Sequence, residues 1–120
     1  HPASVDSIPT GQHHEDHVSM APIAARGCLD VVENLAHIVA IEVLTACQGL
    51  EFRRDGAQYD EFGEIQTGIP VRLAPGVAEL LERVRRVVPR WTEDRVLHRD
   101  IEAVSVMLRS NGLMGREEAW

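Results

Sequence analysis

The sequence predicts an all-α fold, in which one long helix of a central bundle and shorter amphipathic helices form part of a larger helical protein. Three observations lead to this prediction. Ten of the thirteen residues from 35 to 47 are apolar, apolar residues recur at helical spacing from 75 to 88, and a third helical pattern runs from 100 to 111.

The long helix is expected from residue 19 to residue 52, after a loop that spans residues 1–18. Ser19 is a suitable N-cap, and Pro22 falls in the first turn, where its missing N–H is harmless. Two arginines followed closely by Gly56 mark the end of the helix. A helix of this length would extend for roughly 45–50 Å.

The middle of this helix is predicted to be buried on every side. Its ends carry an apolar stripe opposite a polar one, but Ala40, Ile41 and Leu44 occupy positions where the polar stripe would continue. Covering a helix all round takes about four to six neighbouring helices, and the rest of the chain cannot supply them. We therefore expect other protein, either the remainder of the same polypeptide or other subunits, to cover it.

The remaining elements are a loop and two short helices. Residues 53–74 are rich in glycine, lack helical periodicity and are expected to form a long loop. A helix at 75–88 has an apolar stripe and ends before Pro89. A last helix at 100–111 is expected to begin with Asp100 as its N-cap.

The composition argues against two classes of partner. The 120 residues carry a net charge of −7 with 12 basic side chains, all arginine, and five aromatic residues, so the chain lacks the positive field and stacking surfaces that nucleic-acid binding requires. Its apolar stretches are too short to span a membrane. Cys28 and Cys47 belong to no C-x-x-C pair, so a reducing compartment such as the cytoplasm is expected.

A polar run at residues 12–17 is the strongest candidate for a functional site. It precedes the long helix, whose positive dipole end favours anions. Three interpretations are open: a solvated helix entry capped by Asp16, a metal site with His13 and His17 at i,i+4, or an acid/base group or substrate anchor at Glu15. The metal interpretation lacks an obvious third ligand, so no metal is expected.

Other charged residues are expected to have structural roles. Glu42 lies on the apolar face of the long helix, where a lone buried carboxylate costs several kcal/mol, so we expect an ion pair or hydrogen bond to another helix. His37 is expected to pair with Glu33 at a surface or an interface. Four arginines, offset by nearby glutamates, are expected to face solvent: Arg83, Arg85, Arg86 and Arg90.

Several short motifs occur in one order along the chain. They are SVDSIPT at residues 4–10, EDHVSM at 15–20, AAR at 24–26, VEN at 32–34, AIE at 40–42 and QGLEFR at 48–53, with DR at 94–95 and DIE at 100–102. In this order they resemble the carboxyl-terminal portion of the histidine ammonia-lyases, within the aromatic amino-acid ammonia-lyase family. The resemblance is strongest from Ser4 to Arg54.

The resemblance implies a large, nearly all-helical homotetrameric lyase of histidine catabolism, which eliminates ammonia from L-histidine to give trans-urocanate. It implies that Glu15 is the catalytic glutamate, which contacts the substrate imidazole or assists ammonia departure. The family's electrophile is a methylidene-imidazolone made from an Ala-Ser-Gly triplet, which is absent here and would come from upstream sequence. The chain would supply one wall of the active site and part of the tetramer core, and is expected to be inactive alone.

Two residues beside Glu15 depart from the family pattern. The family usually has Asn and Gln before this glutamate, whereas this chain has His13 and His14. An imidazole differs from a carboxamide in its hydrogen bonds and can carry charge near neutral pH. His14 is therefore a candidate substrate-binding residue, with a loop-stabilising role as the other interpretation. The alternative function for the whole chain is a noncatalytic helical interaction subunit or a decayed homologue.

Overall fold

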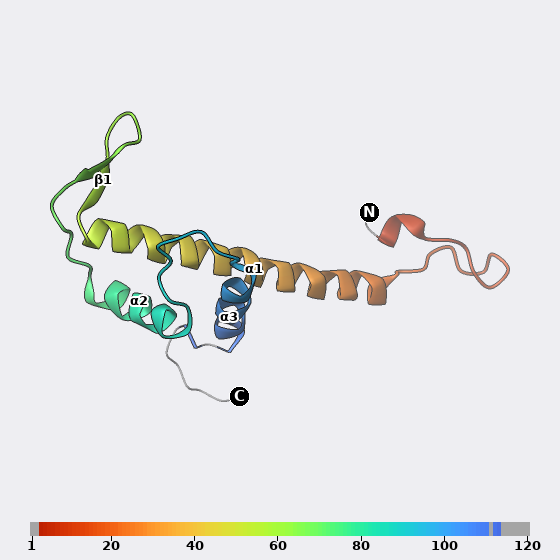
Figure 1. Ribbon diagram of the computed structural model, residues 1–120. Coiled ribbons are helices and arrows are strands. Elements are labelled where there is room, and N and C mark those ends of the chain that lie inside the picture. Colours follow the sequence, from red (N-terminus) through yellow and green to blue (C-terminus); the bar gives the residue numbers. More distant parts are fainter. Residues whose placement is uncertain (1–2, 111, 114–120) are drawn as a thin grey trace. The chain divides into compact units, whose positions relative to one another are not determined.

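The computed structural model describes residues 3–110 and 112–113. Helices dominate it, which confirms the predicted fold class (Figure 1). The elements in chain order are the 3-10 turn η1 (Ala3–Asp6), helix α1 (Ala21–Arg54), strands β1 (Ala57–Tyr59) and β2 (Ile65–Thr67), and helices α2 (Pro75–Val87) and α3 (His98–Arg109). The chain divides into two compact units, residues 1–35 and residues 36–120.

Helix α1 begins two residues later than expected. The carbonyl oxygen of Met20 accepts the first helical hydrogen bonds, from the backbone N–H groups of Ile23 and Ala24. Met20 itself has a φ of 50°, which lies outside the helical region. Met20, not Ser19, therefore occupies the position before the helix, and the expected cap at Ser19 is wrong.

The second unit is built around a small apolar core. The later part of α1 packs against α2 and α3, and the buried apolar side chains come from all three helices and the segment that follows α2. These side chains are Ala40, Leu44, Cys47, Leu81, Val84, Val88 and Val104. In α1 they recur three or four residues apart, so they line one face of the helix.

The opposite face of α1 has no cover within the part of the chain that the structure describes. Leu44 is 2% exposed, whereas Ile38 is 61% and Ile41 48% exposed. The sequence predicts burial on every side for this stretch, and the described residues provide it on one side. Cover by other protein on the remaining sides stays a prediction.

The segment after α1 contains a hairpin that we did not predict. β1 and β2 pair antiparallel, with Ala57 opposite Thr67. The turn depends on Asp60, whose carboxylate accepts hydrogen bonds from the backbone N–H groups of Phe62 and Glu64, each at 2.9 Å. Because the backbone N–H of Glu64 in particular stabilises the charged form, the pKa of Asp60 is held below its usual value.

The two short helices differ slightly from their expected bounds. Helix α2 has Pro75 in its first turn and ends at Val87, because Val88 precedes a proline and adopts an extended backbone. Helix α3 begins at His98, so Asp100 lies in its first turn and is not its N-cap. Its carboxylate instead accepts a hydrogen bond from Arg95 at 2.8 Å. Residue 111, the expected end of this helix, lies outside the described residues.

Within the described ranges, no helix combines the length and the apolar character that crossing a membrane requires.

Candidate functional site

The candidate catalytic residue Glu15 sits at the end of a tight backbone turn in the first unit. The backbone N–H of Thr10 donates to the carbonyl oxygen of Glu15 at 2.9 Å, and the N–H of Glu15 donates to the carbonyl oxygen of Thr10 at 3.2 Å. Between them, Gly11, Gln12 and His13 have φ values of 58°, 56° and 68°. Three consecutive left-handed residues reverse the chain and bring Thr10 beside Glu15.

The carboxylate of Glu15 is held by a side chain as well as by the backbone. The Thr10 hydroxyl donates a hydrogen bond of 2.7 Å to Oε2 of Glu15. Oε1 accepts no hydrogen bond from any described residue, and Glu15 is exposed in this chain. The turn thus presents a carboxylate with one oxygen bound and the other available to a ligand.

The neighbouring histidines are not gathered into one group. His13 and His14 are both exposed, and the backbone N–H of His14 donates to the carbonyl oxygen of Gly11 at 3.2 Å. His17 is engaged elsewhere, with its Nδ1 at 3.0 Å from the hydroxyl oxygen of Ser7. The i,i+4 spacing of His13 and His17 does not lie on a helix, since α1 begins at Ala21. Among the described side chains, no group of three or more His, Cys, Asp or Glu is arranged to hold a metal ion.

A second contact fixes the end of the loop. The hydroxyl oxygen of Ser7 accepts a hydrogen bond from the backbone N–H of Val18 at 2.9 Å. Ser7 and Thr10 therefore connect the segment of the loop before Gly11 to the segment that contains Glu15 and Val18. Both residues lie in the SVDSIPT motif, but the motif alone does not reveal their roles, because their contacts depend on the left-handed turn.

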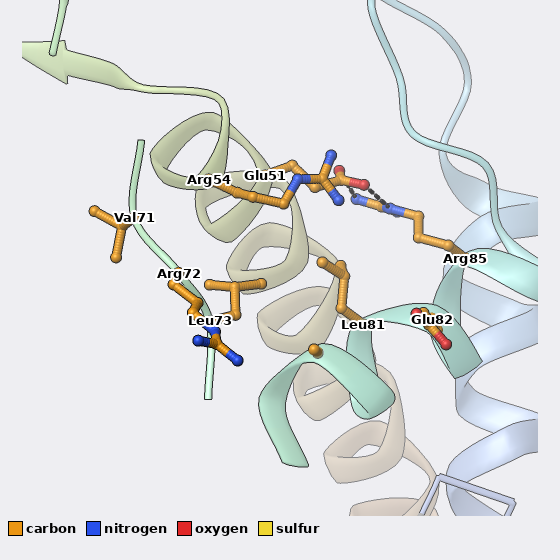
Figure 2. Close-up of a pocket in the computed structure, with 9 residues that line it drawn as sticks. Glu51, Arg54, Val71, Arg72, Leu73, Leu81, Glu82 and Arg85 are labelled. Atoms are coloured by element: carbon orange, nitrogen blue, oxygen red, sulfur yellow. Dashed lines mark hydrogen bonds and ion pairs between the residues drawn. The ribbon is translucent and has the colours of Figure 1, made fainter. Parts of the chain in front are cut away.

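The second unit contains a groove lined by charged and apolar residues (Figure 2). Its volume is about 460 Å³, and its walls come from the end of α1, residues 71–73 and helix α2. The carboxylate of Glu51 receives two hydrogen bonds from Arg85, of 3.0 and 2.8 Å, and the dashed lines in Figure 2 mark this pair. Since these charges satisfy each other, the pair is best explained as a link between α1 and α2.

The position of Arg85 corrects one prediction. We expected four arginines of this region to face solvent, but the side chain of Arg85 is only 13% exposed and that of Glu51 only 6%. Arg85 also donates to the side-chain oxygen of Gln48 at 3.3 Å and lies over the ring of Trp91. Its partners Glu51 and Gln48 are 34 and 37 residues away, on α1, so helical spacing alone could not reveal them.

Two further charged residues, Glu42 and His37, do not form the contacts within the chain that the sequence suggests. Glu42 is exposed and forms no ion pair with any described residue, because α2 and α3 pack on the face of α1 that carries Ala40 and Leu44. The described residues therefore supply no partner for Glu42, and a pair with another helix of the larger protein stays a prediction. His37 is paired, as predicted, but its partner is Glu102 of α3 at 3.0 Å rather than Glu33.

Comparison with known proteins identifies relatives over nearly the whole chain. The family model described as aromatic amino acid lyase matches residues 1–93. A protein named histidine ammonia-lyase from Sorangium cellulosum is 43% identical over 118 residues, and one from Shouchella clausii is 45% identical over 112 residues. These matches cover 98% and 93% of this chain but only 20% and 19% of the two relatives.

A solved structure gives the same result in three dimensions. The crystal structure of histidine ammonia-lyase from Trypanosoma cruzi matches with a TM-score of 0.76 and 41% sequence identity, over 96% of this chain and 20% of that one. The chain spans about a fifth of the length of the relatives it matches. A family model over more than half of the chain and a matching structure at this identity settle the family. The chain belongs to the aromatic amino acid lyases.

Proposed function

We propose that this chain is the carboxyl-terminal portion of a lyase that eliminates ammonia from L-histidine to give trans-urocanate. The observation that carries the proposal is the Glu15 carboxylate, held in a defined turn with one free oxygen, in a chain that belongs to this family. The chain would contribute one wall of the active site and part of the core of a homotetramer. It would be inactive alone.

Glu15 and His14 are the residues to which we assign the chemistry. The free Oε1 of Glu15 can accept a hydrogen bond from the substrate imidazole or from an N–H of the protonated amino group that leaves as ammonia. His14 precedes it on the same turn and is exposed, so its ring is open to contact with a ligand. An imidazole at this position can both donate and accept a hydrogen bond.

The electrophile of the reaction would come from outside this chain. A methylidene-imidazolone forms from an Ala-Ser-Gly triplet, and the 120 residues contain none. The loop also offers carboxylate and imidazole groups, which suit a polar substrate. When present, the methylidene-imidazolone supplies the electron-poor centre for elimination, and the residues of this chain bind and orient the amino acid beside it.

The cysteines support a reducing compartment, for which we propose the cytoplasm. Cys28 and Cys47 are both free thiols. Cys47 is buried in the core, and its burial raises the pKa of its thiol. Free thiols of this kind persist where disulfides do not form readily.

A noncatalytic helical interaction subunit, or a decayed homologue, is the alternative function. This chain has His13 and His14 where the family usually has Asn and Gln, and this difference favours the alternative. The two functions predict opposite outcomes for an activity measurement.

The test is a chimera in which this chain replaces the matching fifth of the Sorangium cellulosum relative. We expect it to convert L-histidine to trans-urocanate, measured by the absorbance of the product. Glu15→Gln should lower kcat by about 10²- to 10⁴-fold, the usual contribution of a positioned acid or base. Asp16→Asn, the matched control on the next residue, should have a much smaller effect.

Failure of the chimera to form urocanate, while the unmodified relative does so, would support the noncatalytic alternative. Equal effects of Glu15→Gln and Asp16→Asn would contradict the assignment of Glu15. His14→Gln should change the KM for L-histidine if His14 contacts the substrate, and an unchanged KM would leave His14 with the loop-stabilising role.

A further inference from the structure

The hydroxyl group of Thr10 forms the hydrogen bond that the Glu15 carboxylate receives from the described residues. The bond from Oγ1 to Oε2 is 2.7 Å long, which is in the short range typical of hydroxyl donors bound to charged oxygens. Thr10 is half-buried, whereas Glu15 is exposed. The donor is therefore the better fixed of the two partners.

The backbone keeps this donor in register with the carboxylate. The two backbone hydrogen bonds between Thr10 and Glu15, at 2.9 and 3.2 Å, place their side chains on adjacent positions of the turn. The turn needs left-handed conformations at Gln12 and His13, which are costly for residues with a Cβ atom. Strain of this kind persists only where the surroundings determine the backbone, and it is frequent at functional sites.

We propose that Thr10 is a positioning residue, whose hydroxyl group holds Oε2 of Glu15 so that Oε1 faces the substrate. This inference rests on the proposed role of Glu15 in the lyase reaction. A carboxylate on an exposed loop can rotate about its side-chain bonds, and a fixed hydrogen bond to one oxygen removes part of this freedom. The other oxygen then has a defined direction, which acid/base chemistry requires.

A threonine hydroxyl can be removed with little change in shape. Thr10→Val keeps the branched side chain and both backbone hydrogen bonds but deletes the donor. Thr10→Ser keeps the donor and deletes a methyl group. In the chimera described above, Thr10→Val should lower kcat, the parameter that Glu15→Gln also lowers. The expected decrease is about 10- to 100-fold, the range for a hydrogen bond to a charged group. Thr10→Ser should retain most of the activity.

A double-mutant cycle separates this role from a structural one. In the Glu15→Gln background, Thr10→Val should cause no further loss, because Thr10 acts only through the carboxylate. An equal loss in both backgrounds would overturn the proposal, and so would equal activities of Thr10→Val and Thr10→Ser. If Glu15→Gln is itself harmless, the proposed role of Glu15 fails, and the positioning role of Thr10 fails with it.

Amide hydrogen exchange on the chimera, in which the rest of the lyase is present, tests the geometry of the turn without a measurement of activity. Removal of the side-chain hydrogen bond by Thr10→Val should speed exchange at the amides of Thr10 and Glu15 several-fold, while Thr10→Ser should leave it close to that of the unmodified chimera. Identical exchange in all three proteins would show that the hydroxyl does not hold the turn, and would contradict the proposal whatever the activity of the chimera.

Discussion

The two halves of helix α1 differ in what covers them. Residues 21–35, in the first unit, are exposed throughout, and Leu35 is 54% exposed. Residues 36–54, in the second unit, bury one face against α2 and α3. The same helix therefore contains a stretch that folds onto partners within the chain and a stretch whose apolar side chains have none among the described residues.

This difference indicates where the chain depends on other protein. A stretch of about 15 residues is a marginal helix in water unless its apolar face is packed. The uncovered stretch carries Ile23, Leu29, Val31, Val32 and Leu35. The loop with Glu15 belongs to the same unit. We therefore expect the candidate catalytic loop to acquire its final order only when the rest of the lyase is present.

The largest effect on the second unit should come from Arg85→Ala. This change leaves Glu51, whose side chain is 6% exposed, without its two hydrogen bonds from Arg85. The other arginine near this carboxylate, Arg90, has its Nε 3.8 Å from Oε2 of Glu51 and makes no hydrogen bond to it. Loss of the hydrogen-bonded partner of a buried charge typically costs about 3–5 kcal/mol. Urea unfolding, followed by circular dichroism, should show a loss of this size in the free energy of unfolding, or an unfolded second unit.

Arg83→Ala is the matched control on the same helix. Arg83 pairs with Glu79, whose side chain is 63% exposed, and such pairs are worth about 1 kcal/mol or less. Equal losses for the two arginines would mean that the Glu51–Arg85 pair does not connect α1 and α2 as described.

A second prediction compares two leucines on the two halves of α1. Leu44→Ala empties a site that is 2% exposed and should cost about 2–5 kcal/mol of unfolding free energy. Leu35→Ala, at a site that is 54% exposed, should change it by less than about 0.5 kcal/mol in the free chain. Similar losses of unfolding free energy at both positions would contradict the difference between the two halves of α1, because they would require Leu35 to be covered within this chain.

The same two substitutions in the chimera test whether the rest of the lyase covers Leu35. If the rest of the lyase covers the first half of α1, Leu35→Ala should lower the thermal midpoint of the chimera although it does not destabilise the free chain. Thermal unfolding of the two chimeras measures this, and an unchanged midpoint for Leu35→Ala would mean that the residue stays exposed in the larger protein.

The smallest effect concerns the contact between α1 and α3. The hydrogen bond from His37 holds the pKa of Glu102 below its ordinary value of 4.5. A carboxylate with a lowered pKa stabilises the folded state fully above its ordinary pKa, and this contribution is lost as the pH falls through the lowered value. The stability difference between the unmodified chain and Glu102→Gln should therefore be present above pH 4.5 and disappear at lower pH.

Urea midpoints measured across this range check the prediction. Glu61→Gln is the control, because Glu61 is exposed and forms no ion pair with the described residues. A difference between Glu102→Gln and the unmodified chain that does not depend on pH would show that the charge on Glu102 plays no part in the contact.

The helices could be predicted because their signals are local. Apolar residues repeat at helical spacing within each segment, and Pro75 and Pro89 limit α2. The hairpin was missed because each of its strands has three residues, too few for an alternating pattern. Its turn depends on side-chain hydrogen bonds from one residue, Asp60.

The candidate site could be predicted in part. The motif around Glu15 identified the family, which the comparisons confirm, but its role in catalysis stays a proposal. Thr10 could not be identified, because its contact requires left-handed backbone at Gln12 and His13, residues that adopt this conformation only rarely. The sequence pattern predicts that Arg85 faces solvent, because its partner Glu51 is 34 residues away and the helical spacing around Arg85 does not reveal it.

The most direct test of the contrast between the two halves of α1 is amide hydrogen exchange, measured residue by residue. In the free chain, we expect residues 36–54 to be protected and residues 21–35 to exchange rapidly. In the chimera with the Sorangium cellulosum relative, both halves should be protected. Equal protection of the two halves in the free chain, or rapid exchange of residues 21–35 in an active chimera, would contradict the account.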